Sequence, residues 1–378
     1  MKIVYCILGT FNSGGMERVL ANKSNYLAQL GHEITIITTD QNNRKPYFPL
    51  NHTIRQIDLG INYTENNNTG LIKKLFDYPK KQKRHKKLLT DQLNKIKPDI
   101  TVSLFDHDVD LLPNINDGSK KIVEIHFSRF KRLQYGRKGL WRLIDKFRSG
   151  RDLATVKRYS KFVVLTHEDK DYWGELDNIV VIPNSNSFPI FEPSLLENKI
   201  VIAVGRYDYQ KRFEDLIEIW KDIQKFAPNW KLNIFGKGPD KNKLQFLIQD
   251  LGLSETVSLK DPVQDIENQY LNSSIIAMTS RYEGLPMALL EGQSAGLPLI
   301  SYACKCGPKD IIDEGFNGFL IDEGDKEKFA EKLLELIEDD HLRKEMGKNS
   351  FNHSKNFSEE VIMQKWIDLF NETLSKKI

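Results

Sequence analysis

Short apolar runs alternate with segments of helical periodicity along this chain of 378 residues, in two successive series. In the first series, the apolar run 2–8 is followed by a glycine-rich loop, a helical pattern at 16–30 and a second apolar run at 33–39. Two parallel strands joined by a helix produce this pattern. It predicts an α/β fold with doubly wound parallel sheets, in which ligands bind beyond the carboxyl ends of the strands.

A break in this pattern separates the two series. Residues 183–187 and the region 189–193 are rich in proline, asparagine and serine, which favour turns. The same plan restarts at 200–204, and a final helical pattern at 359–374 could return to the first domain. We therefore expect two Rossmann-like domains facing across a cleft, one formed by 1–185 with the C-terminal helix at about 359–378 and one formed by 186–358.

Composition argues against several classes of protein. No apolar run approaches the roughly 20 residues of a membrane-spanning helix, and no signal peptide precedes the first strand. We therefore expect a cytoplasmic protein. Cys6, Cys304 and Cys306 lack the second pair of ligands that a zinc site needs, which favours reduced thiols.

The formal net charge of +3 is unevenly distributed along the chain. Residues 71–160 contain 23 Lys and Arg against 10 Asp and Glu, a net charge of +13 that leaves −10 for the remainder. Within 73–87, aromatic residues interleave with the cations, as in interfacial helices. This segment is either a solvated helix face or an attachment to an anionic membrane surface, and the basic stretch 128–151 could border the same site. We expect no nucleic-acid partner, because no recognised binding motif accompanies the charge.

Residues 280–291 contain two carboxylates, Glu283 and Glu291, on either side of a Gly-Leu-Pro turn. An apolar run ends just before this stretch, and a helical pattern begins at Pro286. We expect the amides of Gly284, Leu285 and Met287 to lie unpaired at the start of the helix, where the helix dipole favours an anion. Two carboxylates beside an anion site suggest a ligand that carries both phosphate and hydroxyl groups.

Other polar residues follow predicted strands. Arg206 and Lys211 share the loop after 200–204, so both could reach an anion there. His126 ends the strand 121–125, where ligands bind in this type of fold. The repeated Asp-x-Asp of 106–110 could bind a metal ion, but two cations beside the anion site make a metal unnecessary. The loop 9–15 lacks both the Walker motif and the dinucleotide fingerprint, although Gly14 opens a helix.

Taken in order, these motifs resemble the retaining glycosyltransferases of the Glu-x7-Glu type, glycosyltransferase family four, which have the two-domain GT-B fold. The similarity covers both predicted domains, although the first one matches mainly at its first helix. The matching residues are Gly14-Gly15-Met16-Glu17-Arg18, Gly205-Arg206 with Lys211, Gly236-Lys237-Gly238-Pro239, Glu283-Gly284-Leu285-Pro286 through Glu291, and Gly307-Pro308-Lys309-Asp310-Ile311-Ile312 with Gly318.

The resemblance implies a role for each side chain in the predicted site. Arg206 and Lys211 would neutralise the leaving diphosphate of a nucleotide-sugar. Glu283 would hold a hydroxyl of the transferred sugar, and Glu291 would accept hydrogen bonds from the ribose. His126 would lie near the primary hydroxyl of the sugar.

It also implies backbone contacts. The amides of Gly14 and Gly15, like those of Gly284 and Leu285, would approach the phosphates or the sugar, and Val263 would lie where the backbone meets the base. Arginine and lysine would replace a metal ion, so neither a metal nor another cofactor is expected. The anomeric configuration would be retained.

These expectations describe a metal-independent, membrane-peripheral enzyme on the inner face of the plasma membrane. It would transfer a hexose or N-acetylhexosamine from a UDP- or GDP-sugar to a lipid-linked saccharide in bacterial surface polysaccharide biosynthesis, such as that of capsule or lipopolysaccharide. Two alternatives stay open, a nucleotide-sugar epimerase of the same fold and a non-catalytic protein that binds sugar nucleotides.

Overall fold

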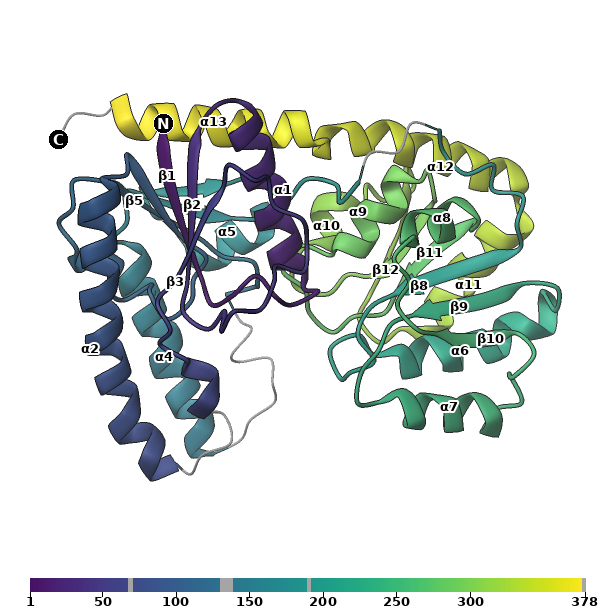
Figure 1. The fold of residues 1–378 in the computed structure, drawn as a ribbon. Helices are drawn as coiled ribbons and strands as arrows, with labels where there is room; N and C mark the ends of the chain where they lie inside the picture. Colours follow the sequence, from purple (N-terminus) through teal and green to yellow (C-terminus); the bar gives the residue numbers. More distant parts are fainter. Residues whose placement is uncertain (67–70, 130–138, 189–191, 376–378) are drawn as a thin grey trace. The chain divides into compact units, whose positions relative to one another are not determined.

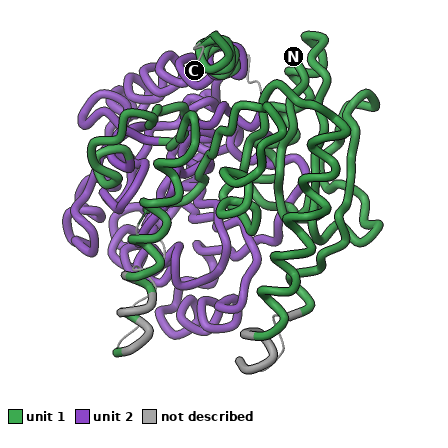
Figure 2. Tube along the Cα trace, turned by 90° about the vertical axis from the view of Figure 1, so that its left-hand side faces the viewer, with its two compact units in different colours: residues 1–165, 170–182, 363–378 green, residues 166–169, 183–362 purple. Residues whose placement is uncertain are grey.

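The computed structural model describes residues 1–66, 71–129, 139–188 and 192–375. Contacts divide the chain into two compact units (Figure 2). The first contains residues 1–165, 170–182 and 363–378, and the second contains residues 166–169 and 183–362. One junction lies at Ile182-Pro183, within the segment where proline and asparagine interrupt the pattern, whereas 189–191 of the predicted break lies outside the described residues.

The first unit contains a seven-stranded parallel sheet in the order β3-β2-β1-β4-β5-β6-β7 (Figure 1). Its central strands are buried along most of their length, as apolar runs in a sheet covered on both faces should be. The strands are β1 Lys2–Ile7, β2 Glu33–Thr38, β3 Arg55–Asp58, β4 Ile100–Ser103, β5 Lys120–Glu124, β6 Lys161–Val164 and β7 Ile179–Val181.

Helices connect these strands, and the predicted unit of strand, helix and strand over residues 2–39 is confirmed. Gly31 follows the first helix with φ of +82°, a conformation that ends helices and that glycine adopts without strain. The helices are α1 Gly15–Gln29, α2 Leu71–Ile96, α4 Leu140–Val156, α5 His167–Trp173 and α13 Glu359–Ser375, with short 3₁₀ turns at Tyr63–Asn66 and Leu112–Asn114.

Helix α2 is the longest helix of the described part of this unit, with 26 residues. Its core-facing side carries His85, Leu89 and Leu93, which are almost fully buried. Because α2 is much longer than the strands beside it, it continues past the carboxyl ends of β1 and β4, as does α4 (Figure 1). Both helices therefore project beyond the edge of the sheet where ligands are expected.

The second unit contains a six-stranded parallel sheet in the order β10-β9-β8-β11-β12-β13. In order of appearance this is the Rossmann arrangement, in which the strand order reverses between β8 and β11. The strands are β8 Ile200–Val204, β9 Lys231–Phe235, β10 Val257–Lys260, β11 Ile275–Met278, β12 Leu299–Tyr302 and β13 Gly318–Ile321.

The helices of the second unit follow the strands as the sequence predicts, with one correction. The helix after the Gly-Leu-Pro turn begins at Met287, and Pro286 is its N-cap with ψ of 98°, outside the helix. The helices are α6 Phe213–Phe226, α7 Lys241–Asp250, α8 Ile266–Leu271, α9 Met287–Ser294, α10 Pro308–Ile311, α11 Lys326–Glu338 and α12 Asp340–Ser354, with a 3₁₀ turn at Lys355–Phe357. Residues 359–362 of α13 group with this unit, and the rest of α13 groups with the first.

Candidate functional site

Two loops of the second unit meet at the point where the strand order reverses. One follows β8 and the other follows β11, and these strands are neighbours in the sheet. The amide of Arg281 donates to the carbonyl of Gln210 over 2.8 Å. The side chain of Gln210 donates to the carbonyl of Tyr282 over 2.9 Å. These bonds hold the two predicted motif loops together at the carboxyl edge of the sheet.

Lys211 and Glu283 form an ion pair across these loops. Lys211 Nζ lies 2.7 Å from Glu283 Oε1, and the two side chains are 16% and 8% exposed. The aliphatic part of Lys211 lies over Gly205, where a Cβ would be 2.8 Å from its Cε. Glycine at 205 therefore allows the lysine to lie flat along the backbone and reach the carboxylate.

Arg206 is placed differently from Lys211, although both follow β8. Its side chain is 77% exposed, and Nε lies 3.5 Å from Asp208 Oδ2. An exposed pair of this kind contributes little to stability. The structure thus brings Lys211 and Glu283 together and leaves the guanidinium of Arg206 at the surface of the same loop.

Hydrogen bonds hold the backbone of Glu283, whereas within the described chain the two amides that follow it donate none. Glu283 exchanges two backbone hydrogen bonds with Lys305-Cys306, of 2.8 and 3.1 Å. In the described chain, the amides of Gly284 and Leu285 donate no hydrogen bond. Gly307 packs against this turn with φ of +99°, and a Cβ there would lie 3.1 Å from the carbonyl oxygen of Gly284. Two amide donors are therefore available beside the Lys211–Glu283 pair.

Glu291 lies inside α9 and is only 6% exposed. Its Oε2 accepts a hydrogen bond of 2.8 Å from the hydroxyl of Tyr270, and its Oε1 accepts one of 2.6 Å from Ser187. Both partners were missed by sequence reasoning, because Tyr270 lies on another helix and Ser187 precedes the whole sheet. The structure therefore presents Glu291 as a carboxylate that already binds hydroxyl groups.

Arg212 is a further residue of this site that the motifs do not indicate. It is the N-cap of α6 and has φ of 51°, the left-handed region that non-glycine residues rarely adopt. Its guanidinium pairs with Asp215 at 2.8 Å and with Glu323 at 3.4 Å. The Thr279 hydroxyl donates to its carbonyl over 3.1 Å. These contacts fix the turn that directs Lys211 towards Glu283.

Val263 lies in the loop after β10 and is 43% exposed. The contacts of the described residues do not join it to Glu283 or Glu291, so its role at the nucleobase stays a prediction.

In the first unit, Gly14 is the N-cap of α1 and Gly15 begins the helix. Glu17 folds back over Gly14, where a Cβ would lie 2.3 Å from Glu17 Oε2, and Asn12 donates to the same carboxylate over 3.2 Å. A glutamate in the third helical position is common at helix starts. Because a carboxylate covers Gly14, the site favours hydroxyl groups over phosphate unless Glu17 moves.

His126 follows β5 and its side chain is 8% exposed. Both ring nitrogens are buried and make no hydrogen bond within the described residues. Its Nε2 lies 3.7 Å from Glu124 Oε1, beyond hydrogen-bonding distance. Leaving a buried polar group without a partner costs about 1–3 kcal/mol. Such an imidazole at the carboxyl end of a strand is suited to receive a ligand.

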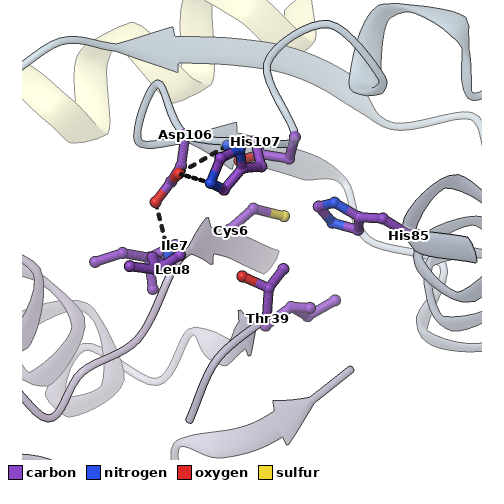
Figure 3. Close-up of a pocket in the computed structure, with 9 residues that line it drawn as sticks. Cys6, Ile7, Leu8, Thr39, His85, Asp106 and His107 are labelled. Carbon is purple, nitrogen blue, oxygen red and sulfur yellow. Dashed lines mark hydrogen bonds and ion pairs between the residues drawn. The ribbon is translucent and has the colours of Figure 1, made fainter. Parts of the chain in front are cut away.

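A narrow hollow lies at the carboxyl ends of β1, β2 and β4 (Figure 3). It leaves no space for a water molecule and is lined by Cys6, Ile7, Leu8, Ile37, Thr39, His85, Asp106, His107 and Asp108. Asp106 accepts hydrogen bonds from the amides of Leu8 and His107, of 3.0 and 2.8 Å. The imidazole of His85 points towards the sulfur of Cys6 (Figure 3).

Burial shifts the titratable groups of this hollow towards their neutral forms. It raises the pKa of Asp108 to about 7 and, together with His107, lowers the pKa of His85 to about 4. Burial also raises the pKa of the Cys6 thiol. The protonated forms of Asp108 and Cys6 are poor ligands for a cation, because a carboxyl or a thiol must lose its proton to bind a metal ion, whereas the neutral imidazole of His85 is the form that can do so.

Three findings concern the described ranges as a whole. Within 1–66, 71–129, 139–188 and 192–375, no three His, Cys, Asp or Glu residues form a group that could hold a metal ion. Within these ranges, Cys6, Cys304 and Cys306 form no disulfide, and all three are buried. In the same ranges, every helix is too short or too polar to span a membrane.

Family models match both halves of the chain. The model described as "Glycosyltransferase Family 4" matches residues 13–185, and "Glycosyl transferases group 1" matches residues 188–353. The amylovoran biosynthesis glycosyltransferase AmsD of Erwinia amylovora is 30% identical over 98% of this chain and 99% of its own length.

A relative from Campylobacter jejuni is 26% identical over 98% of this chain and 99% of its own. It is named GalNAc-alpha-(1->4)-GalNAc-alpha-(1->3)-diNAcBac-PP-undecaprenol alpha-1,4-N-acetyl-D-galactosaminyltransferase. The solved structure of the pneumococcal O-GlcNAc transferase GtfA, a complex with UDP and GlcNAc, has a TM-score of 0.77 at 16% identity and covers 100% of this chain and 99% of that chain. The chain therefore belongs to the glycosyltransferases and has the GT-B fold.

Proposed function

We propose that the chain is a retaining glycosyltransferase of the Glu-x7-Glu type that uses a UDP- or GDP-sugar as donor. The observation that carries this proposal is the Lys211–Glu283 pair beside the unused amides of Gly284 and Leu285. A cation and amide donors suit a diphosphate, and a carboxylate suits sugar hydroxyls. The two hydrogen bonds that Glu291 accepts from hydroxyl groups support its assignment to the ribose, because they show that its carboxylate is placed to accept from hydroxyls.

In the proposed reaction, a hydroxyl oxygen of the acceptor forms a bond to the anomeric carbon of a hexose or N-acetylhexosamine. The bond from that carbon to the phosphate oxygen breaks, and its electron pair stays on the phosphate. The proton of the acceptor hydroxyl passes to a phosphate oxygen on the same face of the sugar, so the anomeric configuration is retained. Lys211 and Arg206 stabilise the charge on the leaving diphosphate, in a reaction that we propose needs no metal ion.

The proposed acceptor is a lipid-linked saccharide of bacterial surface polysaccharide. The names of the Erwinia and Campylobacter relatives support this class, since one acts in amylovoran biosynthesis and the other on a saccharide carried by PP-undecaprenol. We assign the acceptor to the first unit and the donor to the second. His126 and Gly14 are the residues of the first unit that we expect near the sugar.

A basic stripe on α2 supports attachment to the inner face of the plasma membrane. Phe76, Lys80, Lys83, Arg84 and Lys87 are exposed and recur at helical spacing on the side opposite the buried face. Phe76 is 68% exposed, so an apolar group is available beside the cations. Each basic residue near an anionic lipid surface adds about 1 kcal/mol. The side chains of 71–75 and the segment 130–138 lie outside the described residues.

Flotation with vesicles tests this attachment. We expect binding to vesicles of phosphatidylglycerol and phosphatidylcholine, and little binding to phosphatidylcholine alone. Changing Lys80, Lys83, Arg84 and Lys87 to Gln should abolish binding, whereas Lys81 is spared because it bonds to the carbonyl of Asn62. A matched control changes the exposed residues Lys221, Lys225, Lys231 and Lys243 of the second unit. Equal flotation of both variants would refute the attachment.

Product analysis tests the proposed activity. The chain is incubated with UDP- and GDP-sugars, with and without membrane lipid extract, and products are followed by NMR. Transfer with an unchanged anomeric configuration is expected, and Glu283→Gln and Arg206→Ala should abolish it, while the exposed control Glu338→Gln should not. A donor that is isomerised without transfer would indicate the epimerase, and a polysaccharide phenotype that survives both variants would indicate a non-catalytic role.

A further inference from the structure

A buried ion pair lies next to His126 in the first unit. Lys23 Nζ, from α1, lies 2.5 Å from Glu124 Oε2 at the end of β5, and the two side chains are 4% and 1% exposed. Enclosing two charges removes their hydration, so such a pair is weak evidence for stability and is often replaceable by apolar residues. Its presence in this position calls for a further explanation.

The second oxygen of Glu124 faces His126. His126 lies two residues beyond the end of β5, and the distance between the two side chains places the imidazole beside this carboxylate. Glu124 Oε1 is buried without a hydrogen bond in the described chain, and it lies 3.7 Å from His126 Nε2. Because Lys23 occupies Oε2, Oε1 is the oxygen that remains for the imidazole.

We propose that the Lys23–Glu124 pair positions His126 for its ligand. When a ligand is bound, Glu124 Oε1 accepts a hydrogen bond from Nε2–H and leaves Nδ1 as an acceptor for a sugar hydroxyl. The hydrogen bond made by one ring nitrogen sets the protonation of the other. The inference rests on the proposed function, because the transfer reaction supplies the hydroxyl that His126 would meet.

Lys23 makes this arrangement possible because it keeps Glu124 ionised. Burial alone would raise the pKa of Glu124, but the ammonium of Lys23, together with His126, holds that pKa well below its usual range. Trp366 covers the ammonium, with Nζ 3.8 Å from the centroid of its ring, and Tyr5 lies on another side at 5.5 Å. Cation–π contacts of this kind are strongest where water is excluded. The C-terminal helix α13, which carries Trp366, is therefore part of the positioning device.

Substitutions in the Lys23–Glu124 pair can separate its effect on the position of His126 from its effect on the stability of the fold. Glu124→Gln should lower kcat for transfer at least tenfold, with unchanged UDP binding by calorimetry. Lys23→Met should lower the melting temperature, since it leaves a buried carboxylate uncompensated. The double variant Lys23→Met/Glu124→Gln should recover the melting temperature but not kcat. If the double variant recovers both, the pair is only structural and the proposal is overturned.

A second buried pair on the same strand provides the control. Lys121 pairs with Asp117, and their side chains are 10% and 0% exposed. The variant Lys121→Met/Asp117→Asn removes an equivalent pair that does not contact His126. We expect it to change stability by a similar amount and to leave kcat within about twofold of the wild type. An equal loss of kcat in this control would contradict a specific role for Glu124.

The tautomer of His126 gives a readout independent of transfer activity. In protein labelled with ¹⁵N-histidine, the signals of His126 are assigned by their loss in His126→Gln. With a UDP- or GDP-sugar added, we expect Nε2–H in the wild type and a mixture of tautomers in Glu124→Gln. Nδ1–H in the wild type, or an unchanged pattern in the variant, would overturn the proposal. A wild-type chain that transfers no sugar would instead refute the proposed function and leave this measurement valid.

Discussion

Replacing Glu291 by alanine tests the proposed nucleotide site directly. The carboxylate is 6% exposed and accepts hydrogen bonds of 2.8 and 2.6 Å from Tyr270 and Ser187, so it binds hydroxyl groups in the free chain. A hydrogen bond to a charged group contributes about 1.5–3 kcal/mol. If a ribose hydroxyl donates to this carboxylate, its removal should weaken nucleotide binding by about 10- to 150-fold.

The same substitution also affects folding, which the experiment must separate from binding. Without Glu291, the hydroxyl of Tyr270 loses its acceptor inside the protein, which costs about 1–3 kcal/mol of stability. Glu291→Gln keeps the shape of the side chain and one acceptor oxygen, so it should lose less nucleotide affinity and less stability than Glu291→Ala. Binding is therefore compared at a temperature well below the unfolding transition of each variant.

Isothermal titration calorimetry with UDP and GDP measures the effect. Ser187→Ala is the matched control, because it removes the hydroxyl that donates to Glu291 Oε1 but keeps the carboxylate. It should not weaken the binding of UDP or GDP. Glu338→Ala, at an exposed position ending α11, should change nothing. If Glu291→Ala binds UDP and GDP as tightly as the wild type does, the ribose assignment is wrong.

Three further substitutions test other parts of the structure. Lys211→Met should slow transfer by about 10²- to 10³-fold in initial-rate assays, because a cation that stabilises the charge on the leaving group is lost; a change below tenfold would contradict its role. Arg212→Gly should be more stable in urea than Arg212→Ala by about 1 kcal/mol, since only glycine adopts the observed φ of 51° without strain; the reverse order would contradict this. For Asp108, the pKa of about 7 in the folded chain lies above its unfolded value of about 3.9, so the native state holds the proton more tightly. The free energy of unfolding therefore falls as the pH rises between these two values, by up to about 4 kcal/mol. Asp108→Asn should lack that loss when urea unfolding is compared near about pH 5 and about pH 8, and equal pH dependence in both proteins would refute the assignment.

The order of the elements was predictable because each strand of the second unit is a short apolar run followed by a polar loop. This pattern fixes which loops leave the carboxyl edge, and it therefore predicted that Lys211 and Glu283 lie in loops at that edge, as they do. Their contact could not be predicted, since 72 positions separate them and only the sheet order makes their strands neighbours. The helix start at Pro286 was wrong by one residue, because proline fixes φ but left ψ extended here.

Other features depend on side-chain packing, which no local pattern encodes. The partners of Glu291 come from two distant segments, and the left-handed turn at Arg212 carries no glycine to mark it. The position of Glu17 over Gly14, in contrast, follows a local sequence pattern, because a glutamate three residues after an N-cap is common at helix starts. That contact could have been predicted, and it would have directed the prediction for Gly14 towards hydroxyl groups.

The charges of the loops after β8 and β11 explain why we expect their backbone amides to matter for the proposed function. Arg206 pairs with Asp208 and Lys211 pairs with Glu283, so these four side chains carry no net charge together. A diphosphate that enters such a site gains little from side-chain charge unless the pairs open. Glu283 can turn to a sugar hydroxyl only if Lys211 turns to phosphate, and Arg206, at 77% exposure, has the freedom to do the same. The amides of Gly284 and Leu285 need no such exchange, so in the proposed reaction we expect them to set where the phosphate lies before the cations move.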